Sequence, residues 1–441
     1  MRLRRWLQPG MGVKRWLVVA FVGMFLIALA GAHVIRQVTK DLEPGGAAQA
    51  VVDFVTLQFL PFALRGLIIG GVGACLVVLG AARAARNLTQ PLRTSEETPL
   101  AEVIYQKRFL ARGPRIVAIG GGTGLSSLLR GLKEHTGNLT AIVTVADDGG
   151  SSGALREELG IPPVGDIRNC IAALADAEPL MSELLGYRFP GETERGGLGG
   201  HPVGNLLLAA LTALEGGDFE EGVRRMNRVL AVRGQVVPAS ATPITLVART
   251  RDGITVSGQS NIMRTTGIER VWIDPADVHP AGDAIAAIAE ADIVVLGPGS
   301  LYTSVLPVLL IPAIREAVAA APGMRLYVCN VAMQPGETEG YDLADHVEAL
   351  VEHTQADLVD LVLANDRFDG DQPGVDVTWP ADAVQLRWPP AGDDVPHLVT
   401  DTVASRADPH HHDPERLASA ILRAYEREGP AMRRERTARI A

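Results

Sequence analysis

The sequence contains little cysteine and few aromatic residues, and it has no excess of positive charge. Only three of its 441 residues are cysteine, Cys75, Cys170 and Cys329, and no two of them form a Cys-x-x-Cys pair. This pattern excludes a disulfide-stabilised scaffold and suits a reducing compartment. A formal net charge of -10 argues against broad binding of nucleic acid. We find no internal repeat and no long low-complexity tract.

Two stretches near the N-terminus lack charge. In residues 16–35, His33 is the only ionisable group, and residues 66–82 form a second uncharged run. Runs of this length span a bilayer as helices. The first run is too long for a signal peptide and lacks a small-residue cleavage site. We therefore predict a transmembrane hairpin over residues 1–86, with two buried helices of a soluble core as the alternative.

Basic residues flank both runs on their outer sides. Arginine and lysine precede the first run with no acid among them, and Arg83, Arg86 and Arg93 follow the second. The positive-inside rule then places both ends of the hairpin in the cytoplasm. We predict a multi-pass protein of the cell membrane with a cytoplasmic soluble domain. The predicted parts are the hairpin (1–86), a linker (87–114), a soluble domain (115–427) and a charged tail (428–441).

Beyond residue 114, strand-like runs alternate with helix-like runs. The strand-like runs are 116–119, 141–146, 292–296, 326–331 and 358–364, and the helix-like runs include 206–214, 219–230, 284–289, 314–320 and 344–352. This alternation predicts an α/β fold with a doubly wound, mostly parallel sheet and helices on both faces. Residues 245–254 and the segment from Thr255 predict an antiparallel hairpin added to this sheet.

A glycine-rich turn follows the first predicted strand. Residues 120–124 read Gly-Gly-Gly-Thr-Gly and precede leucines at helical spacing. A strand, a glycine turn and a helix N-terminus together form an anion site, because unpaired N–H groups point at one spot. The turn lacks the G-x-G-x-x-G pattern of dinucleotide-binding folds and the Gly-Lys-Ser/Thr of a P-loop. On its own it leaves open both phosphate binding and a merely tight strand–helix connection.

Five further polar, glycine-rich loops lie where the predicted strands and helices meet. They are 147–153, 162–169, 199–205, 297–304 and 330–341. In doubly wound sheets, ligands bind past the carboxyl ends of the strands, so the set predicts a nucleotide or phosphate cleft there. The candidate ligand-binding residues are Gly120, Gly121, Gly122, Thr123, Gly124, Asp147, Asp148, Ser151, Ser152, Asp166, Arg168, Asn169, His201, Asn205, Gly297, Gly299, Ser300 and Thr303.

The paired acids Asp147 and Asp148 have three interpretations. They stand about where an acid meets a ribose hydroxyl in dinucleotide folds, or they hold Mg²⁺ beside a diphosphate. The structural alternative is helix capping through Ser151 or Ser152, with the acids near a helix dipole. The metal ligands are therefore unknown, with Asp147 and Asp148 as the candidates.

Charged and aromatic side chains in the later loops also have open roles. Asp166 and Arg168 orient one another or a phosphate, for which the arginine fork is suited. His201 binds a ligand or makes a structural hydrogen bond. The run of histidines at 410–412 is a metal cluster or a solvated loop. The loop is favoured, because adjacent histidines point in different directions.

A serine hydrolase is a competing interpretation of one loop. Gly149-x-Ser151-x-Gly153 matches the nucleophile elbow of that class, in a strand–turn–helix context. Against it, two adjacent carboxylates would oppose an oxyanion, and the motif follows the second strand of the sheet. We therefore favour the nucleotide cleft and assign no catalytic residue.

Several long motifs, in order, resemble the gluconeogenesis factor family, which belongs to the 2-phospho-L-lactate transferase (CofD-like) superfamily. They are GGGTGLSSLLRGLK, TAIVTVADDGGSSGALREELGIPPVGDIRNCIAALAD, GHPVGN, ADIVVLGPGSLYTSVLP and QPGETEGY. The resemblance covers about residues 115–425 and does not extend to the hairpin, which the usual cytosolic members lack. It implies a Rossmann-like domain with a nucleotide cleft.

The resemblance implies two functions that use the same cleft. The first is a membrane-tethered regulatory protein that binds a UDP-sugar or related nucleotide diphosphate and is linked to cell shape, envelope synthesis and carbon flux. The second is a Mg²⁺-dependent transferase that moves a phospholactyl-like group from a nucleotide diphosphate adduct to a deazaflavin. Aromatic residues make up only 5% of the chain, which offers little for a deazaflavin slot and favours the first. The expected partners are the small-molecule nucleotide, the membrane and a second copy of the chain, but no nucleic acid.

One further candidate comes from the resemblance alone. Family members often carry Arg-His-Asp near the C-terminal helix, where this chain has His411-His412-Asp413. If that arginine contacts a phosphate, His411 weakens the contact or makes it dependent on pH.

Overall fold

The computed structural model describes residues 109–176, 178–190, 198–368, 381–389 and 395–440, with isolated positions between 24 and 71. The chain divides into two compact units, Met1–Phe109 and Leu110–Ala441. Every strand of the described part belongs to the second unit. The two uncharged runs of the predicted transmembrane hairpin, and most of the predicted linker, lie outside the described residues.

The described residues contain one apolar helix pair of note. None of the single helices among them has both the length and the apolar composition needed to cross a bilayer. Leu301–Leu309 and Pro312–Ala319, bent by 82°, meet both criteria only when taken together. Every residue of the first segment is buried in the domain.

A seven-stranded sheet forms the centre of the second unit, in the order β10-β9-β8-β7-β1-β2-β3. All its neighbouring strands are parallel. The strands are β1 (Ile116–Gly120), β2 (Leu139–Val143), β3 (Gln235–Pro238), β7 (Ile293–Leu296), β8 (Met324–Val328), β9 (Leu361–Asn365) and β10 (His397–Asp401). Five of them are buried at every residue, as expected of apolar strands covered on both faces. The predicted α/β fold is confirmed.

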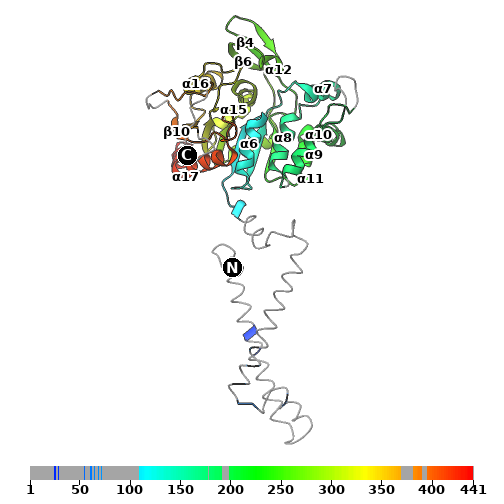
Figure 1. Cartoon of the computed structure of the whole chain (residues 1–441), viewed down its shortest axis with the longest axis vertical. Helices are drawn as coiled ribbons and strands as arrows, with labels where there is room; N and C mark the ends of the chain where they lie inside the picture. Colours follow the sequence, from blue (N-terminus) through cyan, green and yellow to red (C-terminus); the bar gives the residue numbers. More distant parts are fainter. Residues whose placement is uncertain are drawn as a thin grey trace. The chain divides into compact units, whose positions relative to one another are not determined.

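Helices cover both faces of this sheet. Helices α6 (Gly122–Leu132), α8 (Gly165–Leu174) and α17 (Pro414–Ile440) pack together (Figure 1), and α13 (Gly282–Glu290) packs against α15 (Pro312–Ala319). The crossovers through α6 and α15 leave the centre of the sheet in opposite directions, so right-handed connections put them on opposite faces. The other helices are α7 (Gly150–Leu159), α9 (Glu178–Gly186), α10 (Val203–Leu214), α11 (Phe219–Val229), α12 (Gln259–Ile262), η3 (Leu301–Val305), α14 (Leu306–Leu309) and α16 (Leu343–His353).

The strand order reverses at β1. The chain passes from β1 to β2 and β3 on one side, and β7 then pairs with the other edge of β1 and leads to β8, β9 and β10. The loops after β1 and β7 therefore meet at the carboxyl edge of the sheet, where doubly wound folds bind ligands.

A separate antiparallel sheet contains β4 (Thr245–Thr250), β5 (Thr255–Ser257) and β6 (Ile268–Asp274), in the order β5-β4-β6. The predicted β4–β5 hairpin is confirmed, but its placement in the main sheet is wrong, because β4 uses its other edge to pair with β6. Buried and more exposed residues alternate along β4, so only one face of this sheet is covered.

Some element boundaries differ from the predicted ones. We expected a strand over 141–146, but β2 ends at Val143. Val145 and Ala146 are apolar and buried, as strand residues would be, and yet lie outside any strand. Helix α17 continues to Ile440, so the segment expected to be a charged tail is part of a helix. Arginine, glutamate and alanine dominate that segment and are strong helix formers.

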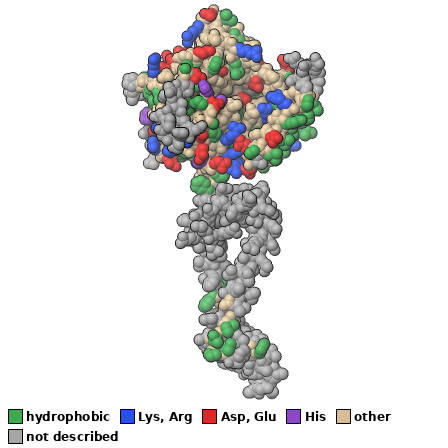
Figure 2. Space-filling view, in the orientation of Figure 1, with side chains coloured by type: hydrophobic (Ala, Val, Ile, Leu, Met, Phe, Trp, Pro, Cys, Tyr) green, Lys and Arg blue, Asp and Glu red, His purple; other side chains and the backbone are tan. Residues whose placement is uncertain are grey.

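Hydrophobic side chains gather on the surface at the edge of the domain where α9 and α10 lie (Figure 2). The exposed ones in this region include Leu180, Leu184, Leu198 and Leu214. Helix α10 contains no charged residue. This apolar surface is distinct from the polar loops that follow the parallel strands.

Candidate functional site

The glycine turn after β1 packs tightly against other parts of the chain. A Cβ atom on Gly124 would lie 2.7 Å from the backbone oxygen of Pro298, in the loop after β7. A Cβ atom on Gly121 would lie 2.6 Å from Asp166 Oδ2. Gly122 has a φ of +63°, which favours glycine, and a Cβ atom there would meet only Ser304 Oγ, at 3.9 Å. Close approach within the protein therefore accounts for glycine at 121 and 124.

The carboxylate of Asp166 lies at the N-terminus of α6. The backbone N–H of Gly122 donates a hydrogen bond to it. Burial, and secondarily the charge of Asp147, raises the pKa of Asp166 to about 6, although the hydrogen bond from Gly122 and the charge of Arg168 oppose this. One N–H group of the expected phosphate cradle is thus bound to an anion that belongs to the chain.

A cavity of about 240 Å³ lies beside this turn, among the loops that follow β2. We call it the arginine cavity. It is lined by Asp147, Gly149, Gly150, Ser151, Ser152, Gly165, Asp166, Arg168, Asn169, Arg188 and Asn205. The N-termini of α7 and α8 both contribute to it, and neither has a side-chain cap. Helix N-termini favour anions, because their first N–H groups have no partner within the helix.

Two guanidinium groups face this cavity. Arg168 donates to the side-chain oxygens of Asn205 (3.1 Å) and Asn169 (2.8 Å). Arg188, at the exposed mouth, donates to the backbone oxygen of Gly200 (2.6 Å). Burial, followed by the nearby charge of Arg188, lowers the pKa of Arg168. Both guanidinium groups therefore bond neutral oxygens and repel each other.

Asp147 forms one wall of the arginine cavity. Its carboxylate accepts the N–H of Gly149 at 2.9 Å and a hydrogen bond from Ser152. Burial raises the pKa of Asp147, and these hydrogen bonds oppose the rise. Ser152 also accepts the N–H of Gly165 at 3.1 Å. Asp147 and Ser152 thus join the starts of α7 and α8.

A chain of hydrogen bonds extends from the cavity into the protein. Ser151 Oγ lies 2.8 Å from His201 Nδ1. Asn205 Nδ2 donates to Ser151 Oγ at 3.0 Å, and Asn205 Oδ1 accepts from Arg168. Ser151, His201 and Asn205 are all buried. The histidine and the serine of the G-x-S-x-G motif, considered separately in the sequence, are therefore in direct contact.

The remaining predicted site residues lie outside the cavity. Asp148 accepts the N–H of Ser260 at 2.8 Å and so joins its loop to α12. Neither Ser151 nor Ser152 caps α7, so the capping alternative is wrong in that form. The hydroxyl of Thr303 is fully buried and donates to Glu337 at 2.6 Å, which leaves no surface for a ligand.

The loops after β7 and β10 also have internal partners. Ser300 Oγ accepts from Gln334 at 2.6 Å. Gly297 and Gly299 have positive φ angles and form the turn against which the β1 loop packs. His411 is exposed, and its Nδ1 lies 2.8 Å from Asp408 Oδ2. In the described part of the chain, no group of three or more His, Cys, Asp or Glu side chains is arranged to hold a metal ion.

Sequence reasoning missed Arg188. It follows α9 and is held by an antiparallel bridge to Pro202, just before α10. The motif pattern placed Arg168 and Asn205 in the site, but Arg188 lies in no glycine-rich loop. Its position depends on how the chain folds back between α9 and α10.

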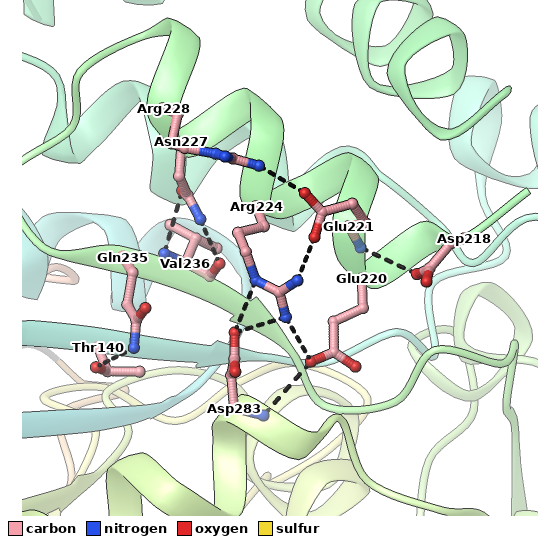
Figure 3. A network of polar contacts seen from close by, with 10 residues as sticks. All are labelled: Thr140, Asp218, Glu220, Glu221, Arg224, Asn227, Arg228, Gln235, Val236 and Asp283. Atoms are coloured by element: carbon pink, nitrogen blue, oxygen red, sulfur yellow. Dashed lines mark hydrogen bonds and ion pairs between the residues drawn. The ribbon is translucent and has the colours of Figure 1, made fainter. Parts of the chain in front are cut away.

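A larger cavity, of about 460 Å³, lies at the opposite edge of the sheet, by the starts of β1, β2 and β3. Its charged groups are already paired. Arg115 bonds Glu290 at 2.9 Å, and Asp283 bonds Arg224 of α11 at 3.0 Å (Figure 3). The amide of Gln235 bonds Thr140 at 3.1 Å. The charged groups of this larger cavity thus have ion-pair partners, whereas Arg168 and Arg188 hydrogen-bond neutral oxygens. We therefore favour the smaller arginine cavity as the functional site.

Comparison with known proteins identifies relatives of the whole α/β domain. Residues 116–381 match the family model described as 2-phospho-L-lactate transferase CofD. The gluconeogenesis factor of Bacillus subtilis (strain 168) is 51% identical over 257 residues, 58% of this chain and 80% of that protein. A protein of Deinococcus radiodurans is 38% identical over 438 residues, 98% of this chain and 91% of its own length.

Solved structures agree with this relationship. The crystal structure of a Bacillus halodurans protein matches with a TM-score of 0.63 and 41% sequence identity. The match covers 70% of this chain and 100% of that one. A second crystal structure, described as a member of the UPF0052 family, gives a TM-score of 0.62 at the same identity.

Proposed function

The chain belongs to the gluconeogenesis factor family within the CofD superfamily, and on that basis we propose that it is a regulatory protein that binds a nucleotide diphosphate. The proposed ligand is a UDP-sugar or a related nucleoside diphosphate, held by its phosphates in the arginine cavity. The proposed output is control of cell shape, envelope synthesis and carbon flux from the cytoplasmic side of the membrane.

The pair of arginines supports this proposal most directly. Arg168 and Arg188 face one cavity and hydrogen-bond only neutral oxygens in the described part of the chain. Asp147 and Asp166 line the same cavity and partly offset the charge of Arg168. Neither forms an ion pair with Arg168 or Arg188 in the described part of the chain, so an added anion would be favourable there. The planar fork of arginine matches the oxygens of a phosphate. Two uncapped helix N-termini add N–H groups at the same place.

The volume of the cavity limits which part of the ligand it holds. At about 240 Å³ it is smaller than the roughly 300–1,000 Å³ typical of pockets for whole small molecules. It therefore suits the phosphates alone. The nucleoside and the sugar would extend from it along the carboxyl edge of the sheet.

The acids beside the cavity fit a divalent cation. Asp147 and Asp166 both line the cavity, and the charge of Asp147 contributes, after burial, to the raised pKa of Asp166. Mg²⁺ is commonly bound by one or two carboxylates together with substrate phosphates. Asp147 and Asp166 would hold such an ion here, in place of the adjacent pair first considered, because Asp148 bonds α12 instead. The ion would neutralise phosphate charge.

A transferase remains the second candidate, because the matching family model is that of a transferase. The same acids and arginines would then hold the nucleotide diphosphate of a donor. The transferase would also bind an acceptor and transfer a group to it from the donor, whereas the regulatory protein would only bind the nucleotide. The protein is incubated with a nucleotide diphosphate donor, a deazaflavin and Mg²⁺. Only a transferase would give a deazaflavin that carries the transferred group.

Calorimetric titration of the purified chain with UDP-glucose, UDP, GDP and uridine tests the first candidate. We expect UDP and UDP-glucose to bind and uridine not to bind, because the nucleoside alone brings no anion to the cavity. Binding of uridine as tight as that of UDP would contradict phosphate recognition. Tighter binding of GDP than of UDP would favour the transferase.

A further inference from the structure

The contact between Ser151 and His201 has the arrangement of a nucleophile and its base. Ser151 is the second residue of α7 and lines the arginine cavity. Its Oγ lies 2.8 Å from His201 Nδ1. The two residues are 6% and 2% exposed, so the contact is shielded from bulk water on all sides except the cavity.

Asn205 sets the direction of the serine hydrogen. Its Oδ1 accepts from Arg168 at 3.1 Å, which turns its Nδ2 toward Ser151 Oγ at 3.0 Å. Because Oγ accepts a hydrogen from Asn205, its own proton is free to point at the nearby nitrogen of His201. This direction of the hydrogen bond requires the His201 tautomer that carries hydrogen on Nε2 and accepts at Nδ1.

We propose that Ser151 is a nucleophile, that His201 is its general base, and that the electrophile is the phosphorus of a phosphoric anhydride bound in the arginine cavity. The choice of substrate class rests on the proposed function, while the serine–histidine pair itself does not. A hydroxyl within hydrogen-bond reach of a base is the usual arrangement for covalent catalysis. The G-x-S-x-G spacing is typical of such a serine, but the sequence alone offered no histidine partner and did not favour this interpretation.

The proposed step transfers a phosphoryl group to the serine. Ser151 Oγ forms a bond to phosphorus as the anhydride P–O bond breaks, and the departing oxygen keeps that electron pair. The proton of Oγ moves to Nδ1 of His201. Arg168, Arg188 and the uncapped first turn of α7 stabilise the charge on the phosphoryl oxygens. In the sequence, the adjacent carboxylates of Asp147 and Asp148 argued against a hydrolase. The two arginines offset the charge of Asp147, and Asp148 bonds Ser260 outside the cavity.

Diisopropyl fluorophosphate tests the pair without any nucleotide, because its phosphorus accepts the same attack with loss of fluoride. The full chain in detergent is treated with the reagent, and the adduct is located by intact mass and peptide mapping. We expect one adduct, on Ser151, and none in Ser151→Ala. His201→Asn retains a polar atom near the position of Nδ1 but cannot take up the proton, so we expect labelling at least tenfold slower.

Ser182→Ala, at a half-buried serine of α9 outside the cavity, is the matched control and should label at the normal rate. Thermal unfolding shows whether each variant is folded. If His201→Asn is not, Asn205→Ala replaces it and should also slow labelling, because the serine hydrogen is no longer directed. Labelling of folded His201→Asn, or of folded Asn205→Ala where it replaces that variant, at the wild-type rate would overturn the assignment of the base.

Titration with UDP separates the two proposals. A folded chain that binds UDP but gives no adduct on Ser151 overturns the nucleophile and leaves the proposed function intact. A chain that gives a histidine-dependent adduct but does not bind UDP overturns the proposed function and keeps the pair. Protection of Ser151 by inorganic pyrophosphate would support a phosphoric anhydride as the substrate class, and its absence at saturating pyrophosphate would overturn that class.

Discussion

At the scale of single residues, Arg188 is the side chain whose removal best tests the site. It is exposed at the mouth of the arginine cavity, and it donates a hydrogen bond to one backbone oxygen, that of Gly200. We expect Arg188→Ala to weaken UDP binding at least tenfold, about 1.4 kcal/mol. The melting temperature should change little, because the side chain is exposed.

Arg249→Ala is the matched control for this prediction. Arg249 is an exposed arginine of β4 that pairs with Glu269 at 3.1 Å, outside the arginine cavity. The substitution Arg249→Ala removes the same charge as Arg188→Ala and should leave the affinity for UDP unchanged. Equal losses in the two variants would mean that net charge, and not the cavity, attracts the ligand.

Asp166 gives the protein a stability that depends on pH. Its pKa is raised from 3.8 to about 6 in the folded state, first by burial. The folded protein therefore holds this proton more tightly than the unfolded chain, and stability falls as pH rises from about 4 to about 6. We expect Asp166→Asn to be the more stable protein at pH 7, by at most about 3 kcal/mol.

Urea unfolding at several pH values measures this effect. The stability difference between Asp166→Asn and the wild type should disappear below about pH 4, where the carboxyl is protonated in both states. The amide oxygen of the variant can still accept the N–H of Gly122. A difference that stays constant between pH 4 and 7 would show that packing, and not the proton, separates the two proteins.

The sequence located the site by its loops but could not assign each side chain. Asp147 and Ser151, in and just after the glycine-rich loop that follows β2, do converge on one cavity with Asn205, which lies at the start of α10, after the glycine-rich stretch between α9 and α10. Thr303 lies in such a loop as well, but its hydroxyl is turned inward toward Glu337. Which way a loop side chain points depends on partners far away in the chain, and a motif does not contain that information.

At the scale of elements, the turn between β1 and α6 separates two uses of glycine. Position 122 needs glycine for its backbone angle, since its φ is +63° and a Cβ atom would make only an ordinary contact with Ser304 Oγ at 3.9 Å. Gly124 needs glycine for space, because a Cβ atom would lie 2.7 Å from the Pro298 oxygen. We expect Gly122→Ala to cost about 1 kcal/mol of folding free energy. Gly124→Ala should cost more, because the β7 loop must move.

Thermal unfolding of the two variants tests this order. In an ordinary helix position, glycine to alanine stabilises by about 1 kcal/mol, so a stabilising Gly124→Ala would show that the two loops do not pack as described. We also predict that a larger residue at Gly122 weakens nucleotide binding. This effect is best measured with the small alanine substitution, which introduces the least strain.

Elements of the main sheet were predictable, and the second sheet was only partly so. Strands such as β1 and β7 are continuous apolar runs between glycine-rich loops, which is what burial on both faces requires. Strand β6 is harder to recognise, because only three of its seven residues, Ile268, Val271 and Ile273, are buried. Its partner β4 then completes a sheet of its own, which no local pattern specifies.

At the scale of the whole molecule, the α/β domain corresponds to an entire protein in a relative. The Bacillus halodurans structure is covered over 100% of its length by 70% of this chain. We therefore expect a shortened protein that begins at Ala111 to be soluble in the absence of detergent and to bind UDP as the full chain does. Gel filtration and calorimetry measure this. Aggregation of the shortened protein would show that the first unit is needed for folding.

The last prediction concerns the membrane hairpin, which would hold the site near the membrane. Residues 16–35 and 66–82 are flanked by arginine and lysine on their outer sides, so both chain ends should lie in the cytoplasm and only the segment between the runs outside. In a chain with its three cysteines replaced, we expect a membrane-impermeant maleimide applied to whole cells to label Gly45→Cys and not Glu96→Cys. Permeabilised cells should label both, which shows that Glu96→Cys is reactive. Labelling of Glu96→Cys alone in intact cells would place the arginine cavity outside, away from the cytosolic pool of nucleotide sugars, and would contradict both the topology and the proposed regulatory function.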